Sequence, residues 1–207
     1  PANSGFFDCV EIQAEPGSIV WATEPAPTFD RENTAQRVAD VIFGAFSHLD
    51  PTKVTAAGNG CISYFNLAGY DTRNHRPYVY VETIGGGSGA RYNKDGLDAV
   101  HVHMTNTSNL PVEALEMEYP LMVEQYALYE DSCGPGKFRG GMGIVRSIRI
   151  LPESQNSRLV SASTERCKRH PWGLEGGGGG GLCSITITRQ GKVRYDAPKM
   201  QGIRLQD

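Results

Sequence analysis

Glycine is the residue that most limits how this chain can fold. It accounts for 25 of the 207 residues, against a usual share of about 7%. The glycines gather in three clusters with no repeat period, at residues 85–89, 133–143 and 173–181. Glycine weakens the interiors of helices and strands and favours turns, whereas the segments between the clusters are rich in β-branched and aromatic residues. The pattern predicts strands separated by glycine-rich loops.

Length and composition are those of an ordinary globular protein. A chain of 207 residues has room for one large domain or two small ones, and we treat residues 1–207 as one unit with a candidate sub-boundary near 131–140. Hydrophobic residues make up 39% and charged residues 21%, and no apolar run reaches the roughly 20 residues that a membrane span needs. The chain starts with Pro1 instead of Met and its strand-and-turn pattern runs to the last residue. We therefore expect a piece of a longer chain, with neither a membrane nor a signal segment.

The cysteines favour a reducing compartment. Their number is odd, they are widely spaced, and no C-x-x-C pair occurs, which argues against a disulfide scaffold and against a zinc knuckle. A cytoplasmic protein is the expectation. The five residues are Cys9, Cys61, Cys133, Cys167 and Cys183.

Charge is distributed unevenly along the chain. Residues 1–131 carry 7 basic and 18 acidic side chains, and residues 132–207 carry 13 basic and 5 acidic ones. The two parts should attract each other, or each should attract a charged partner. The basic part lacks the interleaved aromatic residues that stack on single-stranded bases, so the sequence does not favour nucleic acid as a partner.

The periodicity predicts an α+β protein dominated by mixed β-sheets, with one long amphipathic helix. Apolar residues of segment 33–51 recur with helical spacing, Asn33 with Gln36 resembles a capping box, and Pro51 ends the segment. We expect this helix to pack on the core. A shorter helical piece follows Ser108 and ends at Pro120. The predicted strands are residues 9–14, 61–67, 77–84, 99–105, 121–130, 143–151, 158–163 and 182–189.

Two glycine runs have the outline of a nucleotide loop but the wrong surroundings. The run after residue 84 matches G-x-G-x-x-A, yet "RYNKDGLD" follows where a helix should begin. The hexaglycine at 176–181 matches the pattern trivially and leads into a predicted strand, and no G-x-x-x-x-G-K-[ST] occurs. We therefore expect this chain to bind no cofactor of its own, and any ATP to be handled elsewhere.

Two residue pairs could carry chemistry, and each has a plainer explanation. His101 and His103 lie two apart on a predicted strand, so both would face the same side, as metal ligands can. Hydrogen-bonded strand histidines are the alternative. Glu113 and Glu116 share one face of the short helix, where they could divide acid and base roles or simply be solvated or favour the helix N-terminus.

The loop at 131–143 offers two further candidates. Cys133 could be a nucleophile, but no histidine partner is visible nearby. Arg139, beside paired glycines, could bind an anionic group with its side chain and the backbone N–H groups. A structural salt bridge from Arg139 to the acidic part of the chain is an equal alternative.

Five ordered blocks resemble the later part of the hydantoinase B/5-oxoprolinase family. They are "PANSGFFDCVEIQAEPGSIVWATEPAPT", "RVADVIFGAF", "ETIGGGSGARYNKDGLDAVHVHMTNTSNLPVEALEMEYPL", "YEDSCGPGKFRGGMGIVR" and "RHPWGLEGG". The resemblance spans nearly the whole chain. It includes T-N-T-x-N-x-P-V-E-x-L-E and K-x-R-G-G-x-G, and is more specific than any single motif above.

The resemblance implies an ATP-dependent hydrolase of cyclic amides, such as hydantoins or 5-oxoproline, working as a hetero-oligomer. An A-type partner would use ATP, and the remaining N-terminal part of the family would complete the protein. The His- and Asp-rich motifs that bind the family's divalent metal lie upstream of anything matched here, so we expect no metal site in this chain. The chain also has "DSCG" where the family usually has D-S-G-G, which weakens the case for Cys133 as a shared catalytic residue.

By resemblance, "TNTSNLPVEALE" is a family signature, and its small hydroxyls and amides, followed by a capped helical turn, could bind a polar ring or stabilise the loop that carries it. The predicted substrate-binding residues are Asn106, Thr107, Asn109, Glu113 and Arg139, and no catalytic residue is assigned. A structural alternative is that they satisfy buried backbone groups at a junction. Two other functions stay open: part of an ATP-dependent acetone or acetophenone carboxylase, and a noncatalytic module that supports assembly. We expect the isolated 207 residues to be inactive.

Overall fold

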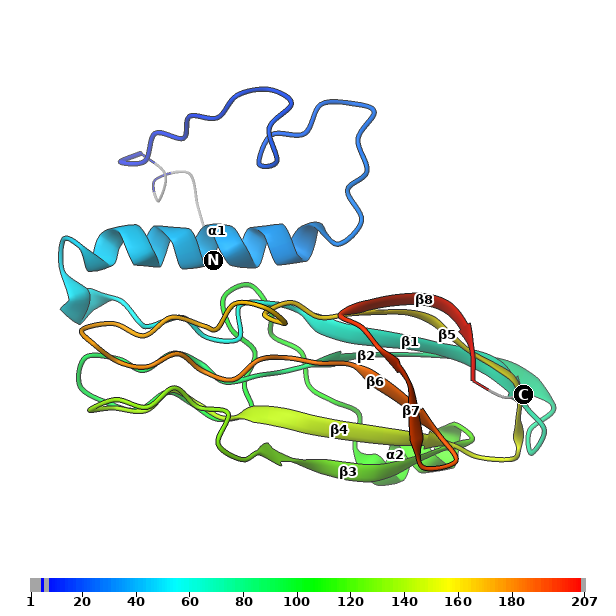
Figure 1. Ribbon diagram of the computed structural model, residues 1–207. Coiled ribbons are helices and arrows are strands. Elements are labelled where there is room, and N and C mark those ends of the chain that lie inside the picture. Colours follow the sequence, from blue (N-terminus) through cyan, green and yellow to red (C-terminus); the bar gives the residue numbers. More distant parts are fainter. Residues whose placement is uncertain (1–4, 6–7, 206–207) are drawn as a thin grey trace.

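The computed structural model describes Gly5 and residues 8–205 and shows an α+β protein built mainly from antiparallel strands, as predicted (Figure 1). None of the described helices combines the length and the apolar character needed to cross a bilayer. The elements are α1 (Arg31–Ser47), the 3₁₀ turn η2 (Pro51–Lys53), β1 (Ser63–Asp71), β2 (Arg76–Ile84), α2 (Val112–Glu118), β3 (Leu121–Tyr129), β4 (Gly143–Ile150), β5 (Ser154–Ser163), β6 (Thr186–Arg189), β7 (Lys192–Asp196) and β8 (Lys199–Arg204).

Three sheets make up the body. A four-stranded sheet has the order β2-β1-β5-β8, and the pairs β3–β4 and β6–β7 form two separate hairpins. Because the large sheet and the β3–β4 hairpin face each other with α2 beside them (Figure 1), their facing side chains form the core. The core residues with the lowest exposure are Leu67, Tyr78, Tyr80, Leu115, Leu121, Leu159, Ala162 and Met200.

Two predicted strands are wrong, and two strands were missed. Residues 9–14 form no strand, and residues 99–105 form only an isolated bridge between Val100 and Gly86. Ala99 and His103 have φ values of 55°, which belong to the left-handed region and interrupt an extended chain. Alternating apolar residues therefore did not suffice to make a strand. The missed strands β7 and β8 are short and polar. They are strands because β7 pairs with β6 and β8 pairs with β5.

The three glycine clusters meet in space, although they are far apart in sequence. A methyl group added at Gly87 would lie 1.9 Å from the carbonyl oxygen of Gly141, and one at Gly134 would lie 2.6 Å from that of Gly178. Backbone hydrogen bonds join the same segments, for example from the Gly141 N–H to Ser88 O at 2.8 Å. Only glycine leaves room for backbones to approach this closely, so the clusters are a packing device.

Ion pairs confirm the predicted attraction between the acidic and basic parts of the chain. Carboxylates from residues before 132 meet cationic side chains from residues after 131, and two of the four pairs, those of Arg166 and Arg146, are largely buried. These pairs are Asp30 with Lys199 at 3.1 Å, Asp40 with Arg166 at 2.5 Å, Glu82 with Arg146 at 3.0 Å and Asp98 with Arg139 at 2.7 Å.

Helix α1 forms where it was predicted, but the prediction that its apolar stripe packs on the core is wrong. Its buried residues are the polar Asn33, Gln36 and Asp40, whereas Val41 and Phe46 are 69% and 54% exposed. The predicted capping box is wrong as well, since Asp30 is the residue at the N-cap. The polar side chains of Asn33 and Gln36 instead bind distant loops, at Ile62 N and at Val102 O with Thr105 Oγ1.

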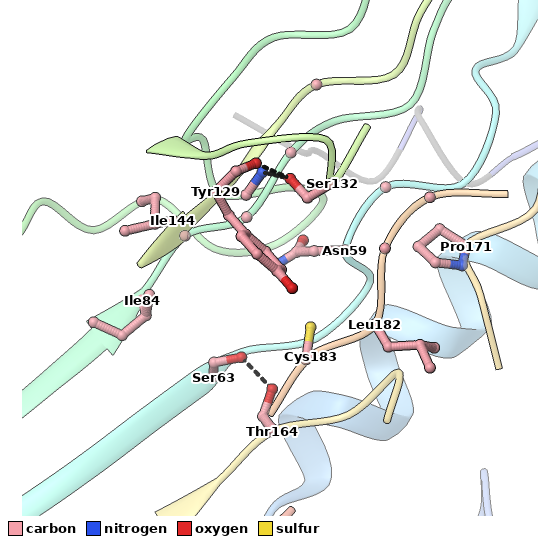
Figure 2. A pocket seen from close by; sticks show the side chains of 18 of the residues that line it. Asn59, Ser63, Ile84, Tyr129, Ser132, Ile144, Thr164, Pro171, Leu182 and Cys183 are labelled. Atoms are coloured by element: carbon pink, nitrogen blue, oxygen red, sulfur yellow. Dashed lines mark hydrogen bonds between the residues drawn. The ribbon is translucent and has the colours of Figure 1, made fainter. Parts of the chain in front are cut away.

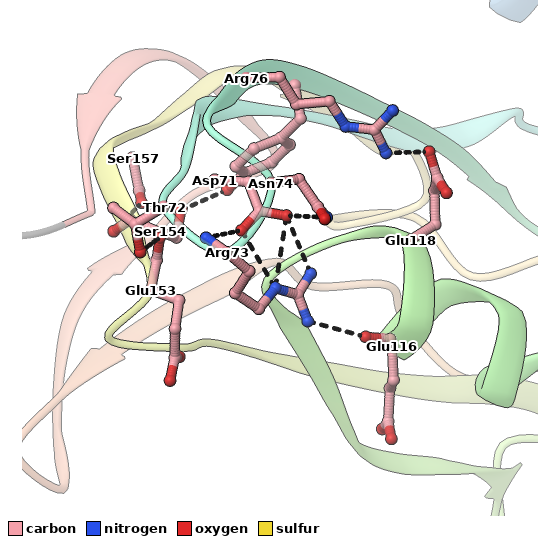
Figure 3. Close-up of polar contacts among 11 residues, drawn as sticks. Asp71, Thr72, Arg73, Asn74, Arg76, Glu116, Glu118, Glu153, Ser154 and Ser157 are labelled. Atoms are coloured by element: carbon pink, nitrogen blue, oxygen red, sulfur yellow. Dashed lines mark hydrogen bonds and ion pairs between the residues drawn. The ribbon is translucent and has the colours of Figure 1, made fainter.

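The turn between β1 and β2 is held by a buried carboxylate (Figure 3). Asp71, which is 1% exposed, accepts hydrogen bonds from the backbone N–H and the guanidinium of Arg73 and from Asn74. The same guanidinium donates to Glu116 O at 3.2 Å, which ties α2 to the turn. The hydrogen bonds from Arg73 lower the pKa of Asp71 to about 2.

We expect Gly141→Ala to destabilise the fold. Its new methyl group would lie 1.9 Å from Leu97 O, and a clash with backbone cannot be relieved by a rotamer change. We expect the substitution to lower the free energy of unfolding, measured by urea denaturation, by about 1–3 kcal/mol or more. Gly143→Ala is the matched control, because its methyl group would meet Ser132 Oγ at an ordinary 3.7 Å. Equal stability of the two variants would contradict the proposed packing role.

Asp71 should also contribute a pH-dependent part of the stability. Its folded-state pKa of about 2 lies below the unfolded value of about 3.9, so its contribution is present above pH 4 and is lost as the pH falls towards 2. Asp71→Asn should cost on the order of 1 kcal/mol at pH 7, and its difference from the unsubstituted chain should shrink between pH 4 and pH 2. Urea unfolding at a series of pH values measures this. A difference that is independent of pH would show that the charge of Asp71 is not responsible.

Candidate functional site

The loop after Asp98 passes the end of β2, and two of the predicted substrate-binding residues bind that strand. The Asn109 amide donates a hydrogen bond to Thr83 O at 2.9 Å. The Thr107 and Thr83 hydroxyls are 2.5 Å apart, and Thr107 Oγ1 also lies 3.1 Å from His101 Nε2. Thr83 is thus the point at which the loop is attached to the sheet.

A buried ion pair lies next to this attachment. Glu82 on β2 and Arg146 on β4 form two hydrogen bonds of 3.0 and 3.1 Å, and their side chains are 3% and 2% exposed. The guanidinium also lies 4.5 Å from the ring centre of Tyr126, and the Tyr126 hydroxyl donates to Asn109 Oδ1 at 2.9 Å. Asn109 in turn binds Thr83 on β2. The ion pair therefore helps to hold the loop that carries Asn109 against β2. Burial and the charge of Glu82 together raise the pKa of the neighbouring Tyr80.

Sequence reasoning missed this ion pair, although the sequence holds a signal for it. In "YVYVETI", Glu82 is in phase with Tyr78 and Tyr80, and in "GIVRSIRI", Arg146 is in phase with Ile144 and Ile148. Alternate residues of a strand face the same side, so each charge belongs to an apolar face. Opposite charges at such positions on two strands predict a buried pair.

His101 and His103 do not form the predicted pair on one face. His101 binds Thr107, and burial lowers the pKa of its imidazole, which favours the neutral ring at pH 7. Its Nδ1 atom is buried without a hydrogen-bond partner among the described residues. His103 binds Asp40 at 2.9 Å.

The described residues do not fit a divalent metal ion. They contain no group of three or more His, Cys, Asp or Glu side chains arranged to hold one, and the Asp40 carboxylate beside His103 is already paired with Arg166 at 2.5 Å. We therefore assign no step to a metal at this site.

The glycine clusters do not fit the phosphates of a nucleotide either. A phosphate loop needs backbone N–H groups that point at the ligand, whereas here many glycine N–H groups donate to backbone carbonyls at 2.7–3.1 Å. Those within the clusters that are bonded in this way are Gly86, Gly140, Gly141, Gly177, Gly178, Gly180 and Gly181.

Arg139 is held by Asp98. Its guanidinium donates to both Asp98 carboxylate oxygens, at 2.7 and 3.0 Å, and to Gly140 O. The Met142 N–H also donates a hydrogen bond to Asp98 Oδ1, at 2.7 Å. These hydrogen bonds lower the pKa of Asp98, and those from Arg139 have the largest effect. The salt bridge considered as an alternative for Arg139 is therefore present, and it fixes the loop at 139–142.

Asn106 and Glu113 are exposed, and the side chain of neither makes a hydrogen bond within the described part of the chain. Glu116, which was considered as an acid–base partner of Glu113, accepts from the Val123 N–H at 2.9 Å. Asn106 and Glu113 are therefore the predicted residues whose polar side chains are most available to a ligand.

A separate cavity of about 1470 Å³ opens between the glycine clusters, the large sheet and the hairpins (Figure 2). Ser63 and Thr164, whose hydroxyls are 2.6 Å apart, lie on one wall. Tyr129 and Ile144 lie on another. None of the five predicted site residues lines this cavity, but Arg146 does, which makes the ion pair the link between cavity and loop. The volume exceeds the roughly 300–1,000 Å³ of a small-molecule pocket.

The cysteines of interest lie at this cavity and do not include Cys133. Cys183 lines it, and the buried Cys61 has its Sγ atom 3.4 Å from the Oγ atom of Ser63, which is also a lining residue. The neighbouring Cys183 thiol lowers the pKa of the Cys61 thiol, despite burial. Cys133 makes no comparable contact within the described residues.

Comparison with known proteins gives consistent matches along the chain. A sequence model described as hydantoinase B/oxoprolinase matches residues 1–206. The chain is 35% identical over 187 residues to a putative D-/L-hydantoinase component of Pseudomonas sp. (strain NS671), covering 90% of this chain and 30% of that protein. It is 37% identical over 183 residues to the 5-oxoprolinase of Dictyostelium discoideum, covering 86% of this chain and 13% of that protein.

A solved structure also matches. The ATP-dependent caprolactamase from Pseudomonas jessenii has a TM-score of 0.64 and 29% identity, covering 83% of this chain and 30% of that chain. The chain thus spans about a third or less of the length of these relatives.

Breaking the buried ion pair should be costly. We expect Arg146→Met to lower the free energy of unfolding by about 3–5 kcal/mol, because it leaves the Glu82 carboxylate buried without a partner. The double variant with Glu82→Gln should recover part of the loss. Arg149→Met on the same strand is the control. Its ion pair with Glu124 is half exposed, so a change below about 1 kcal/mol is expected. Equal losses in the two single variants, measured by urea denaturation, would rule out a special role for the buried pair.

Proposed function

Because the chain belongs to the hydantoinase B/oxoprolinase family, we propose that it is part of an ATP-dependent enzyme that hydrolyses cyclic amides. The match of the family to residues 1–206 carries this proposal. The relatives support it, since their names refer to hydantoin, 5-oxoproline and caprolactam. These three compounds share an amide bond within a ring, and we propose a substrate of that class.

The proposed enzyme divides its work between chains. An amide resists water because resonance makes its carbonyl a weak electrophile, and ATP is the energy source that we propose for overcoming this in the whole complex. We assign ATP and any divalent metal to an A-type partner and to the remainder of the family's length, since the described residues fit neither group. The complex is then a hetero-oligomer.

We propose that this chain contributes a polar wall for the ring through the loop at residues 106–109. The Asn106 amide has both a donor and an acceptor, so it can pair with the ring carbonyl and the ring N–H together. Thr107 adds a hydroxyl. Asn109 holds the loop in place through its hydrogen bonds with Thr83 and Tyr126. In this proposal it is therefore a positioning residue.

Arg139 and Glu113 take different places in the same proposal. Arg139 acts indirectly, because its guanidinium is held by Asp98 and fixes the glycine loop. Glu113 lies exposed in the first turn of α2, where it can contact a ring bound at the loop.

A noncatalytic assembly module is the second candidate function. The observation in its favour is that three of the five predicted substrate-binding residues, Thr107, Asn109 and Arg139, already bind groups of the protein itself. In that case the chain shapes the larger protein, and the chemistry belongs entirely to other parts of the complex.

The test is turnover by the complex of this chain with its A-type partner and the remainder of the family's length. We expect ATP-dependent ring opening of hydantoin, 5-oxoproline or caprolactam. ATP-dependent consumption of acetone or acetophenone with bicarbonate, without ring opening, would overturn the proposal in favour of a carboxylase.

In the same assay, Asn106→Ala should lower kcat/KM by about tenfold, the scale of a lost substrate hydrogen bond, and should leave the melting temperature unchanged. Ser108→Ala in the same exposed loop is the control and should retain full activity. Arg139→Ala should lower stability together with activity. Unchanged kinetics for Asn106→Ala would remove this residue from the site and favour the assembly module.

A further inference from the structure

Helix α1 directs its apolar stripe away from the body of the protein. The stripe begins at Val38, which is 38% exposed, and extends to Leu49, which is 81% exposed. No charged side chain interrupts it, because Asp40 points to the opposite, buried side. We call this stripe the α1 apolar face, and it consists of Val38, Val41, Ile42, Ala45, Phe46 and Leu49.

The opposite side of α1 is anchored by buried polar contacts. Gln36, which is fully buried, donates to Val102 O at 3.1 Å and to Thr105 Oγ1 at 2.7 Å. Asn33 Oδ1 accepts from the Ile62 N–H at 2.9 Å. The helix therefore binds the loops with its polar side chains.

A charged cluster fixes the same orientation. The Asp40 carboxylate, which is 5% exposed, binds His103 at 2.9 Å, Arg166 at 2.5 Å and Arg37 at 3.3 Å. Rotating α1 to bury its apolar stripe would separate this carboxylate from its partners, and an unpaired buried charge is strongly unfavourable. The exposure of the apolar face is consequently built into the fold.

The segment before α1 has the same character. Residues 8–30 run along the side of the molecule where α1 lies (Figure 1). They expose large apolar side chains with little regular structure of their own, including Ile19 at 84%, Trp21 at 51% and Phe29 at 80%. Contiguous apolar surfaces of this kind usually mark a contact with another polypeptide segment.

We propose that the α1 apolar face is an internal interface, covered by the part of the hydantoinase B/oxoprolinase polypeptide that lies outside the region matched by these 207 residues. The length of the relatives supports this occupant, because the chain covers only 30% of the Pseudomonas sp. hydantoinase component and 30% of the caprolactamase chain. A helix with a polar side bound to one layer and an apolar side facing out fits the middle of a layered domain. The inference depends on family membership and not on the substrate.

The experiment compares the 207-residue chain with a chimera in which it replaces the matched region of the hydantoinase component of Pseudomonas sp. (strain NS671). Val41→Cys is introduced into both, and maleimide labelling is located by peptide mass spectrometry. We expect Cys at position 41 to label at least about tenfold more slowly in the chimera, because burial protects a thiol until the structure opens locally. Val193→Cys, at a site that is 60% exposed on β7, is the control and should label equally in both.

Two outcomes would overturn the proposal. Equal labelling at position 41 in both proteins would show that the face stays open. Protection that already occurs in the 207-residue chain and increases with its concentration would identify a second copy as the occupant.

A second pair of variants does not depend on labelling. Val41→Glu with Phe46→Glu should leave the melting temperature of the 207-residue chain unchanged, since both sites are exposed, and should prevent cooperative folding of the chimera. Cooperative unfolding of the substituted chimera at the parent's melting temperature would overturn the proposal as well.

Discussion

Close packing of one backbone on another is the constraint on which the rest of this structure depends. Gly87 and Gly141 leave no space for a methyl group between their segments, and the N–H groups of the same segments are used in hydrogen bonds between loops. Because three glycine clusters meet in this way, long irregular loops become an ordered layer beside the sheets. That layer lies at the ends of β2 and β4 and forms one wall of the cavity.

Charge then decides how the acidic and basic parts of the chain are joined. The Glu82–Arg146 pair is buried between two sheets, and a pair this well shielded tolerates no loss of one partner. Arg146 contacts the Tyr126 ring, and the Tyr126 hydroxyl binds Asn109, so the pair helps to position the loop at 106–109. The polar residues of this loop therefore have different roles in the structure. Some of them position the loop, and Asn106 is left free to meet a ligand.

The helix shows why amphipathicity alone does not identify a buried side. In α1 the polar stripe is buried, because Gln36 and Asp40 find partners on two loops, and hydrogen-bonded polar groups can be buried at little cost. The apolar stripe remains for another layer. A chain that spans about a third of its relatives' length is expected to expose surfaces that are internal in the longer proteins.

The sequence by itself determined the α+β class, the long helix at about the right residues, most of the strands, the attraction between oppositely charged parts and the family, because these depend on local periodicity, composition and ordered motifs. Only the tertiary structure decided that residues 99–105 are not a strand, that the polar side of α1 is the buried one, and that Arg139 is held by Asp98. The contacts behind these outcomes join groups far apart in the chain, for example Arg139 with Asp98 or Arg166 with Asp40. A local pattern contains no information about which distant group will satisfy a buried charge or an N–H.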